Sequence, residues 1–273
     1  MKYTDKKKNI EIVAKNIELG DNIQFGNNIS VSLKGNFLLN SNSRLGDNAH
    51  IRGNNVSFGK HLFNSSGLRI GGGGRNGPNA NLTIGDRCTI HNNFINVCES
   101  VEIGDDVGLS PEVSFLTHGY WQSVLEGYPA KFAGIKIGNG VIIGYRSLVM
   151  MGVEIADNCV IGAQSVVTRH LTRNGIYAGS PAELVKWIKP LTRQQRIDTL
   201  VEIIESYRPI AEYHGIDSDI SVHYPFVRTN KFTFNVETFA YFGEEDEDTD
   251  DLRDYIRKYG IRIYTERPFK SKA

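Results

Sequence analysis

Residues 137–167 read IGNGVIIGYRSLVMMGVEIADNCVIGAQSVV. An amphipathic helix repeats its apolar stripe every three or four residues, and a simple strand alternates with a period of two. Neither pattern explains this segment, whose aliphatic residues recur at every sixth position. They are Ile137, Ile143, Val149, Ile155, Ile161 and Val167. A step of six is typical of a short strand that alternates for a few residues and then turns a corner.

The same step of six occurs further upstream. It links Ile17, Ile23 and Ile29, Leu45 and Ile51, Ile84 and Ile90, and Ile103, Leu109 and Phe115. Asn, Asp and Gly follow most of these residues, and they tolerate the positive φ of a tight corner. Three strands and three corners bring the chain back to its starting face. The sequence therefore predicts a mainly β protein, a parallel β-helix with a triangular cross-section. The alternative, an antiparallel sheet of hairpins, seldom keeps a strict hexad through six steps.

The positions where the hexads begin and end predict the domain boundaries. We expect an N-terminal segment at 1–16, the β-helix at 17–182, and an α-helical linker with a small α+β appendage at 183–273. Two breaks inside the β-helix predict inserted loops at about 71–81 and 116–135, and such loops are common sites of function. The first loop contains GGGGRNG, which is not a phosphate-binding loop because no GK[ST] follows it.

The appendage has its own local signals. ELVKWIK and LTRQQRIDTLVEIIESY are helical in pattern, with Thr192 as a candidate N-cap and Leu200, Ile203, Ile204 and Tyr207 as an apolar stripe. KFTFNVETFAYF and IRIYTE have the pattern of strands, and LRDYIRKYG that of a helix closed by Gly260.

Charge excludes one class of function. The 31 basic residues balance the 31 acidic ones, so the chain does not bind nucleic acid through bulk positive charge. The segment EEDEDTDD, residues 244–251, carries seven carboxylates, and the remainder of the chain is correspondingly positive. We expect the acidic run to be a solvated turn that leads into a helix at Leu252.

Cysteine content and hydropathy favour a cytoplasmic protein. The three cysteines, Cys88, Cys98 and Cys159, have no CxxC spacing, so each is expected to be a small buried residue rather than part of a disulfide or zinc site. No apolar run reaches the roughly 18 residues of a membrane-spanning helix, and the N-terminus lacks the apolar core of a signal peptide.

The closing coils resemble a known family. Residues 137–186, which end in AGSPAELVK, are similar to the hexapeptide-repeat acyltransferases, the left-handed β-helix enzymes, and in particular to their galactoside, maltose and polysaccharide O-acetyltransferase branch. IGDRCTIHNNFINV and IGDDVGLSPEVSFLTHG, upstream, resemble the two coils that build the acceptor site of that branch. The left-handed coiling is implied by this resemblance, because periodicity does not show handedness.

The resemblance implies an activity and an assembly. Members of this branch are homotrimers that use acetyl-CoA as donor and need no metal, and their active sites lie in grooves between neighbouring prisms. We therefore expect transfer of an acetyl group from acetyl-CoA to a hydroxyl of a sugar or surface polysaccharide unit.

Two residues match the catalytic motifs of the family. His118, in FLTHGY, matches the general base, and a neutral imidazole suits that task because its ordinary pKa is about 6.5. Asn93 matches an asparagine that faces the acceptor hydroxyls; the alternative, a corner asparagine chosen for its positive φ, applies at least equally to Asn92.

Tyr145 matches the position whose main-chain N–H polarises the thioester carbonyl, where the family usually has a small residue. The family also commonly has a tryptophan where this chain has Ile142, so Tyr120 and Trp121 are the candidates for stacking on an acceptor sugar. For coenzyme A, Ala163 and Thr168 match wall positions beside the pantetheine arm. Arg169 and Lys186 match basic positions near the phosphates, which accept charge-assisted hydrogen bonds.

Three alternatives stay open at this point. The same histidine could serve N-acetylation of an amino group on a nucleotide sugar. The β-helix could be an assembly scaffold without activity, or a zinc carbonic anhydrase, which needs two histidines five residues apart. The last is disfavoured because Ser123 stands five residues after His118.

Overall fold

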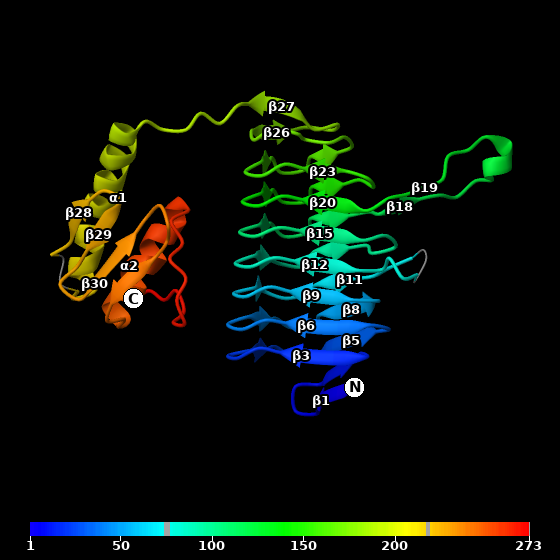
Figure 1. The fold of residues 1–273 in the computed structure, drawn as a ribbon, viewed down its shortest axis with the longest axis horizontal. Helices are drawn as coiled ribbons and strands as arrows, with labels where there is room; N and C mark the ends of the chain where they lie inside the picture. The colour runs from blue at the N-terminus through cyan, green and yellow to red at the C-terminus, as the bar shows by residue number, and fades with distance from the viewer. Residues whose placement is uncertain (74–76, 217–218, 273) are drawn as a thin grey trace. The chain divides into compact units, whose positions relative to one another are not determined.

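The computed structural model describes residues 1–73, 77–216 and 219–272, and it divides into two compact units, Met1–Ile188 and Lys189–Ala273. Residues 74–76 of the predicted glycine-rich loop lie outside the described residues. In the first unit, short parallel strands stack coil upon coil into a β-solenoid of about eight turns, counted over the described residues (Figure 1). The predicted parallel β-helix is thereby confirmed.

Each coil contributes one strand to each of three walls, which we call A, B and C in chain order, except that the last coil has only an isolated bridge at Leu171 in wall B. Wall A contains β2 (Ile10–Val13), β5 (Ile29–Leu33), β8 (His50–Gly53), β11 (Arg69–Ile70), β14 (Phe94–Ile95), β17 (Ser114–Phe115), β22 (Leu148–Val149) and β25 (Val166–Val167). Wall B contains β3 (Asn16–Leu19), β6 (Asn36–Leu39), β9 (Val56–Phe58), β12 (Leu82–Ile84), β15 (Val101–Ile103), β20 (Ile135–Ile137) and β23 (Glu154–Ile155). Wall C contains β4 (Gln24–Phe25), β7 (Arg44–Leu45), β10 (Phe63–Asn64), β13 (Thr89–Ile90), β16 (Gly108–Leu109), β21 (Ile142–Ile143), β24 (Val160–Ile161) and β26 (Ile176–Ala178).

The hexad residues form the core of the prism. Ile143 and Val149 are completely buried, and the other aliphatic residues of the repeat lie beside them in one continuous cluster. The three cysteines are buried as predicted, and burial raises the pKa of the Cys88 thiol to about 12. At the corners, Asn158 has a φ of 58°, which is the left-handed conformation that asparagine tolerates.

Both ends of the first unit differ from the prediction. The first wall strand is β2, so the solenoid begins before residue 17; Ile10 and Ile12 are buried and β2 pairs in parallel with β5. At the other end, residues 183–186 form the strand β27 (Glu183–Lys186) rather than a helix. β27 pairs antiparallel with β26, and this pairing overrides the local helical pattern. A further strand, β1 (Lys2–Asp5), pairs antiparallel with β2.

The predicted loop at 116–135 is a hairpin arm that projects from the stack (Figure 1). Its base is formed by β18 (His118–Gly119) and β19 (Lys131–Phe132), which pair antiparallel. A 3-10 turn, η1 (Val124–Glu126), lies near its tip, where Leu125 is 95% exposed. The arm therefore presents apolar side chains to solvent.

The second unit packs two helices with an antiparallel sheet. Its elements are α1 (Arg193–Tyr213), β28 (Ser221–His223), β29 (Phe226–Arg228), β30 (Phe232–Asn235), β31 (Tyr241–Gly243), α2 (Glu247–Ile256) and η2 (Arg257–Tyr259). Thr192 caps α1 in a capping box, and Gly260 ends η2 with a φ of 82°, both as predicted. The segment IRIYTE, predicted as a strand, has no regular secondary structure. Among the residues described, no helix is long and apolar enough to span a membrane.

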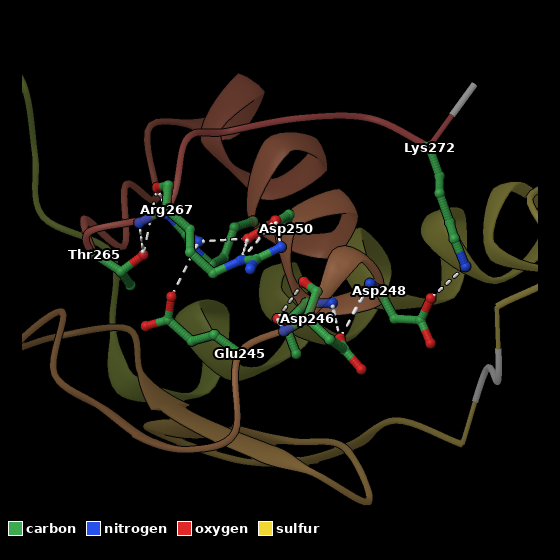
Figure 2. A network of polar contacts seen from close by, with 9 residues as sticks. Glu245, Asp246, Asp248, Asp250, Thr265, Arg267 and Lys272 are labelled. Atoms are coloured by element: carbon green, nitrogen blue, oxygen red, sulfur yellow. Dashed lines mark hydrogen bonds and ion pairs between the residues drawn. The ribbon is translucent and has the colours of Figure 1, made fainter. Parts of the chain in front are cut away.

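The acidic run is a structural element of this unit, and the prediction of a solvated turn is wrong. Asp246 caps α2, which begins at Glu247 rather than at Leu252. Asp250 lies inside the unit, where it accepts hydrogen bonds from Arg253 and Arg267 (Figure 2). The carboxylates near the start of α2 also stabilise the helix through a favourable interaction with its dipole. The cationic partners of the run lie outside it, Lys231 before it and Arg253, Arg267 and Lys272 after it, so the run alone does not reveal them.

Candidate active site

The predicted site residues lie at two different corners of the prism. His118 stands at the corner between walls A and B, just after β17 ends at Phe115. Tyr145 stands at the corner between walls C and A, in the turn from β21 to β22. The width of wall A separates these corners within each coil.

His118 is held at the base of the arm. Its Nδ1 lies 2.9 Å from Oδ1 of Asn96, which comes from the preceding coil. The imidazole stacks against Phe132 at 6.1 Å between ring centroids, and Tyr120 lies 5.4 Å from both rings. No described residue forms a hydrogen bond with Nε2 of His118. One nitrogen is thus engaged and the other is available to a ligand.

Asn96 is a residue that the sequence reasoning missed. It is almost completely buried and follows β14 directly, at the same corner as His118. Its Oδ1 also accepts hydrogen bonds from Oγ1 of Thr117 and from the main-chain N–H of Cys98. The signal was present in HNNFIN, whose last asparagine falls at the end of a wall strand, on the side of the prism that carries the histidine loop.

Asn93 does not lie where the prediction needs it. It has no exposed surface, its Oδ1 accepts the main-chain N–H of His91 at 2.7 Å, and its Nδ2 donates to the carbonyl oxygen of Ser110 at 2.8 Å. The side chain therefore links successive coils instead of facing an acceptor. Asn93 is also absent from the residues with positive φ, so its role here is the side-chain link between coils and not a left-handed corner.

Tyr145 and Ala163 lie one above the other at the corner of walls C and A. Ile143 pairs with Ile161, and Gln164 donates a main-chain hydrogen bond to the carbonyl oxygen of Tyr145 at 2.7 Å. The main-chain N–H of Tyr145 has no acceptor among the described residues. Because both residues are exposed, this N–H is available as a hydrogen-bond donor at the surface.

The Tyr145 side chain is turned aside by polar contacts. Its hydroxyl donates to Oε1 of Glu112 at 3.2 Å, and the Arg146 guanidinium lies 4.9 Å from the ring centroid. Arg146 also donates to Glu112, and this hydrogen bond lowers the pKa of the Glu112 carboxyl. The aromatic ring is thus held along the corner by its neighbours.

The remaining predicted coenzyme A residues are divided between walls. Thr168 and Arg169 follow β25 at the corner of walls A and B, two coils beyond the His118 corner. Lys186 lies on β27, paired with Ile176 of wall C. Arg169 forms an ion pair with Glu183 at 3.0 Å, and both side chains are largely exposed. An exposed pair of this kind is weak, so Arg169 can exchange its partner for a phosphate.

The two aromatic candidates differ in surroundings. Tyr120 is stacked at the base of the arm beside His118, as described above, whereas Trp121 is 89% exposed. A groove of about 750 Å³ on wall B contains none of the predicted site residues; its lining includes Glu102, Lys136, Glu154 and His170.

Comparisons with known proteins agree with the fold. A family model described as bacterial transferase hexapeptide (six repeats) matches residues 134–169. Galactoside O-acetyltransferase of Escherichia coli is 34% identical over 139 residues, which are 50% of this chain and 56% of that protein, so the chain spans little more than half the length of this relative. The putative lipopolysaccharide biosynthesis O-acetyl transferase WbbJ of Escherichia coli is 26% identical over 145 residues, 48% of this chain and 71% of that protein. Among solved structures, a galactoside acetyltransferase in complex with coenzyme A is 24% identical, with 56% of this chain and 65% of that chain covered and a TM-score of 0.35.

Proposed function

Because the chain is a hexapeptide-repeat homologue of sugar O-acetyltransferases, we propose that it transfers an acetyl group from acetyl-CoA to a hydroxyl of a sugar or of a surface polysaccharide unit. The observation that carries the proposal is the state of His118, whose Nδ1 is engaged by Asn96 while Nε2 has no hydrogen-bond partner among the described residues. An imidazole held in this way is suited to remove a proton from a hydroxyl.

In this proposal His118 moves the proton. Nε2 accepts it from the acceptor hydroxyl as the hydroxyl oxygen bonds to the acetyl carbon, and the imidazolium later returns it to the departing CoA sulfur. Acetyl-CoA supplies the acetyl group as a thioester. General-base action of this kind contributes roughly 10² to 10⁴ in rate.

Tyr145 acts through its main chain. Its N–H has no acceptor in the described structure and can donate to the carbonyl oxygen on which negative charge develops. Small Ala163, next to it in the following coil, leaves this corner open for a ligand. Thr168 and the cationic groups of Arg169 and Lys186 are proposed to hold the rest of coenzyme A, with the two cations binding its phosphates.

The separation of the corners supports a closed cyclic homo-oligomer, and the family resemblance makes a homotrimer the assembly that we propose. His118 and Tyr145 lie at opposite edges of wall A, and a complete site needs both, so the corner of one protomer must meet the other corner of a neighbour. Closed cyclic assemblies provide such a contact at every subunit boundary. Sedimentation equilibrium should then give a mass three times that of the 30.5 kDa chain.

The acceptor is proposed to lie near the base of the arm. Tyr120 is fixed beside His118, and exposed Trp121 offers an additional ring for stacking on a sugar. Replacing Trp121 with Ala should raise KM for the acceptor without changing KM for acetyl-CoA.

The activity can be tested with purified protein, acetyl-CoA and a panel of sugars, oligosaccharides and amino sugars, with release of the CoA thiol as readout. We expect His118→Ala to lower kcat on an O-acceptor by about 10² or more. His223→Ala, which changes an exposed histidine of the second unit, is the matched control.

Three results would count against the proposal. Acetylation of amino sugars alone would favour the N-acetyltransferase alternative. Absence of acetyl-CoA binding in calorimetry would favour a scaffold. Near wild-type turnover of His118→Ala would remove the proposed base.

A further inference from the structure

We propose that Asn96, together with the glycine segment Gly71–Gly73 of the preceding coil, is a positioning device that fixes the tautomer of His118. The inference rests on the proposed function only in the use made of the imidazole. The position of the proton on the His118 ring can be measured without an acetyl acceptor.

The orientation of the Asn96 amide is determined by groups that cannot change role. Main-chain carbonyl oxygens accept and never donate, and those of Gly71 and Gly73 lie 3.2 and 3.1 Å from Nδ2 of Asn96. A main-chain N–H donates and never accepts, and that of Cys98 lies 3.3 Å from Oδ1. A flipped amide would oppose oxygen to two carbonyl oxygens, so Oδ1 must face His118.

Thr117 supports the same orientation. Its Oγ1 accepts the main-chain N–H of Glu99 at 3.2 Å, which leaves its proton for Oδ1 of Asn96. The amide oxygen therefore receives hydrogen bonds from a main-chain group and a hydroxyl before the imidazole is considered. Its position and its role as acceptor do not depend on His118.

The tautomer follows from this arrangement. Nδ1 of His118, 2.9 Å from an oxygen that only accepts, must carry a proton. A neutral imidazole has one N–H, so the lone pair is on Nε2, the nitrogen without a described protein partner. A wrong tautomer would place the proton where the base has to accept one, and such errors cost a histidine base several orders of magnitude in rate.

The glycines at 71–73 allow the backbone conformation that this arrangement needs. Gly71 and Gly72 have φ values of 116° and 96°, a region that other residues rarely adopt. A Cβ on Gly72 would lie 2.8 Å from the Phe94 ring. Glycine at these positions lets the chain leave wall A with two carbonyl groups directed at Asn96.

The decisive measurement is the 15N spectrum of the histidine side chains in the full-length protein, by magic-angle-spinning NMR at a pH where His118 is neutral. His118→Gln identifies the signals of His118. We expect a protonated Nδ1 and an unprotonated Nε2 in the wild type. Asn96→Leu should release this preference.

Activity provides the second readout. Asn96→Leu should lower kcat at least about tenfold and leave KM for acetyl-CoA within about twofold, because the base is misplaced while the CoA corner is intact. Gly72→Ala should weaken the tautomer preference less than Asn96→Leu does, since it displaces the carbonyl groups without removing the amide.

Asn64→Leu is the matched control. Asn64 is also fully buried, and it joins successive coils through Gly46 N–H and the His91 carbonyl oxygen, each at 3.0 Å, without contacting His118. If Asn64→Leu and Asn96→Leu alter the His118 signals equally, Asn96 only supports the coil and the inference is wrong. A wild-type spectrum with the proton on Nε2 would also overturn it. Absence of acetyl transfer with the expected spectrum would refute the proposed function and leave the tautomer assignment standing.

Discussion

Pro111 and Tyr145 occupy the same corner position in successive coils. Leu109 pairs with Ile143 on wall C and Ser114 pairs with Leu148 on wall A, so the residues between them are in register. Arg146 donates a main-chain hydrogen bond to the Pro111 carbonyl oxygen at 3.2 Å, which ties the two corners together. This corner of the fold thus accommodates a proline.

Tyr145→Pro is therefore a test of one hydrogen-bond donor with little change in backbone. It removes the free main-chain N–H, and we expect kcat to fall by about 10² to 10³ while the protein stays folded. Tyr145→Ala keeps the N–H and should retain kcat within a few fold. Steady-state kinetics on both variants checks this, and equal loss in the two would show that the side chain, not the main chain, matters.

Mixing two inactive variants should restore activity if the site is shared between protomers. His118→Ala and Tyr145→Pro each damage one corner, so a mixed trimer contains boundaries where both intact corners meet. Random assembly of equal amounts predicts about a quarter of wild-type activity after co-refolding or co-expression. A site built within one protomer would regain none.

The buried ion pair of the second unit should be important for its stability. The Arg253 guanidinium is completely buried and lies 2.9 Å from Asp250, three residues earlier on α2. Arg253→Met removes one of the two cations that contact the Asp250 carboxylate and should destabilise the unit by about 1–3 kcal/mol. Hydrogen exchange of peptides from α2, measured by mass spectrometry, reports the change.

The C-terminal end of α2 offers the control. Arg257 pairs with Asp254 at the same spacing, but its side chain is 48% exposed. Arg257→Met should cost less than about 1 kcal/mol, since exposed pairs contribute little. Equal protection in both variants would contradict the assignment of a structural role to the buried pair.

Asp251 should make the second unit sensitive to acid. Burial alone would raise the pKa of its carboxyl, but hydrogen bonds from the Lys272 main-chain N–H and the Tyr207 hydroxyl outweigh burial, so the pKa lies below the ordinary 3.8. A lowered pKa stabilises the folded state above the unfolded value, and this contribution is lost as pH falls from about 3.8 through the folded value. Urea unfolding of the full chain at several pH values should show the loss, and Asp251→Asn should flatten the dependence.

Much of the fold could be predicted because its signal is local and repeated. The six aliphatic residues from Ile137 to Val167 each bury a side chain on the next wall of the prism, so that every third one returns to the same wall, and the corners follow from Asn, Asp and Gly. The strand β27 could not be predicted in the same way. Its conformation depends on pairing with β26, and the local sequence ELVK does not indicate that pairing.

The site was predictable only in part. The histidine loop made His118 a candidate, but the spacing in HNNFIN does not distinguish an asparagine that links coils from one that meets the next coil's loop. That distinction depends on where the strand ends: Asn93 precedes β14 and Asn96 follows it. The prediction of a solvated turn at 244–251 was wrong for a related reason. Arg267, which binds Asp250, lies 17 residues further along the chain.

The antiparallel strands at the two ends of the solenoid have a consequence for association. A stack of parallel strands exposes unpaired main-chain groups at its first and last coils, and such edges promote growth into fibres. Here β1 covers the start of wall A and β27 covers the end of wall C, each running against the direction of its neighbour. An incoming chain would find the edges of β2 and β26 already paired, so removal of β1 or β27 should increase end-to-end association.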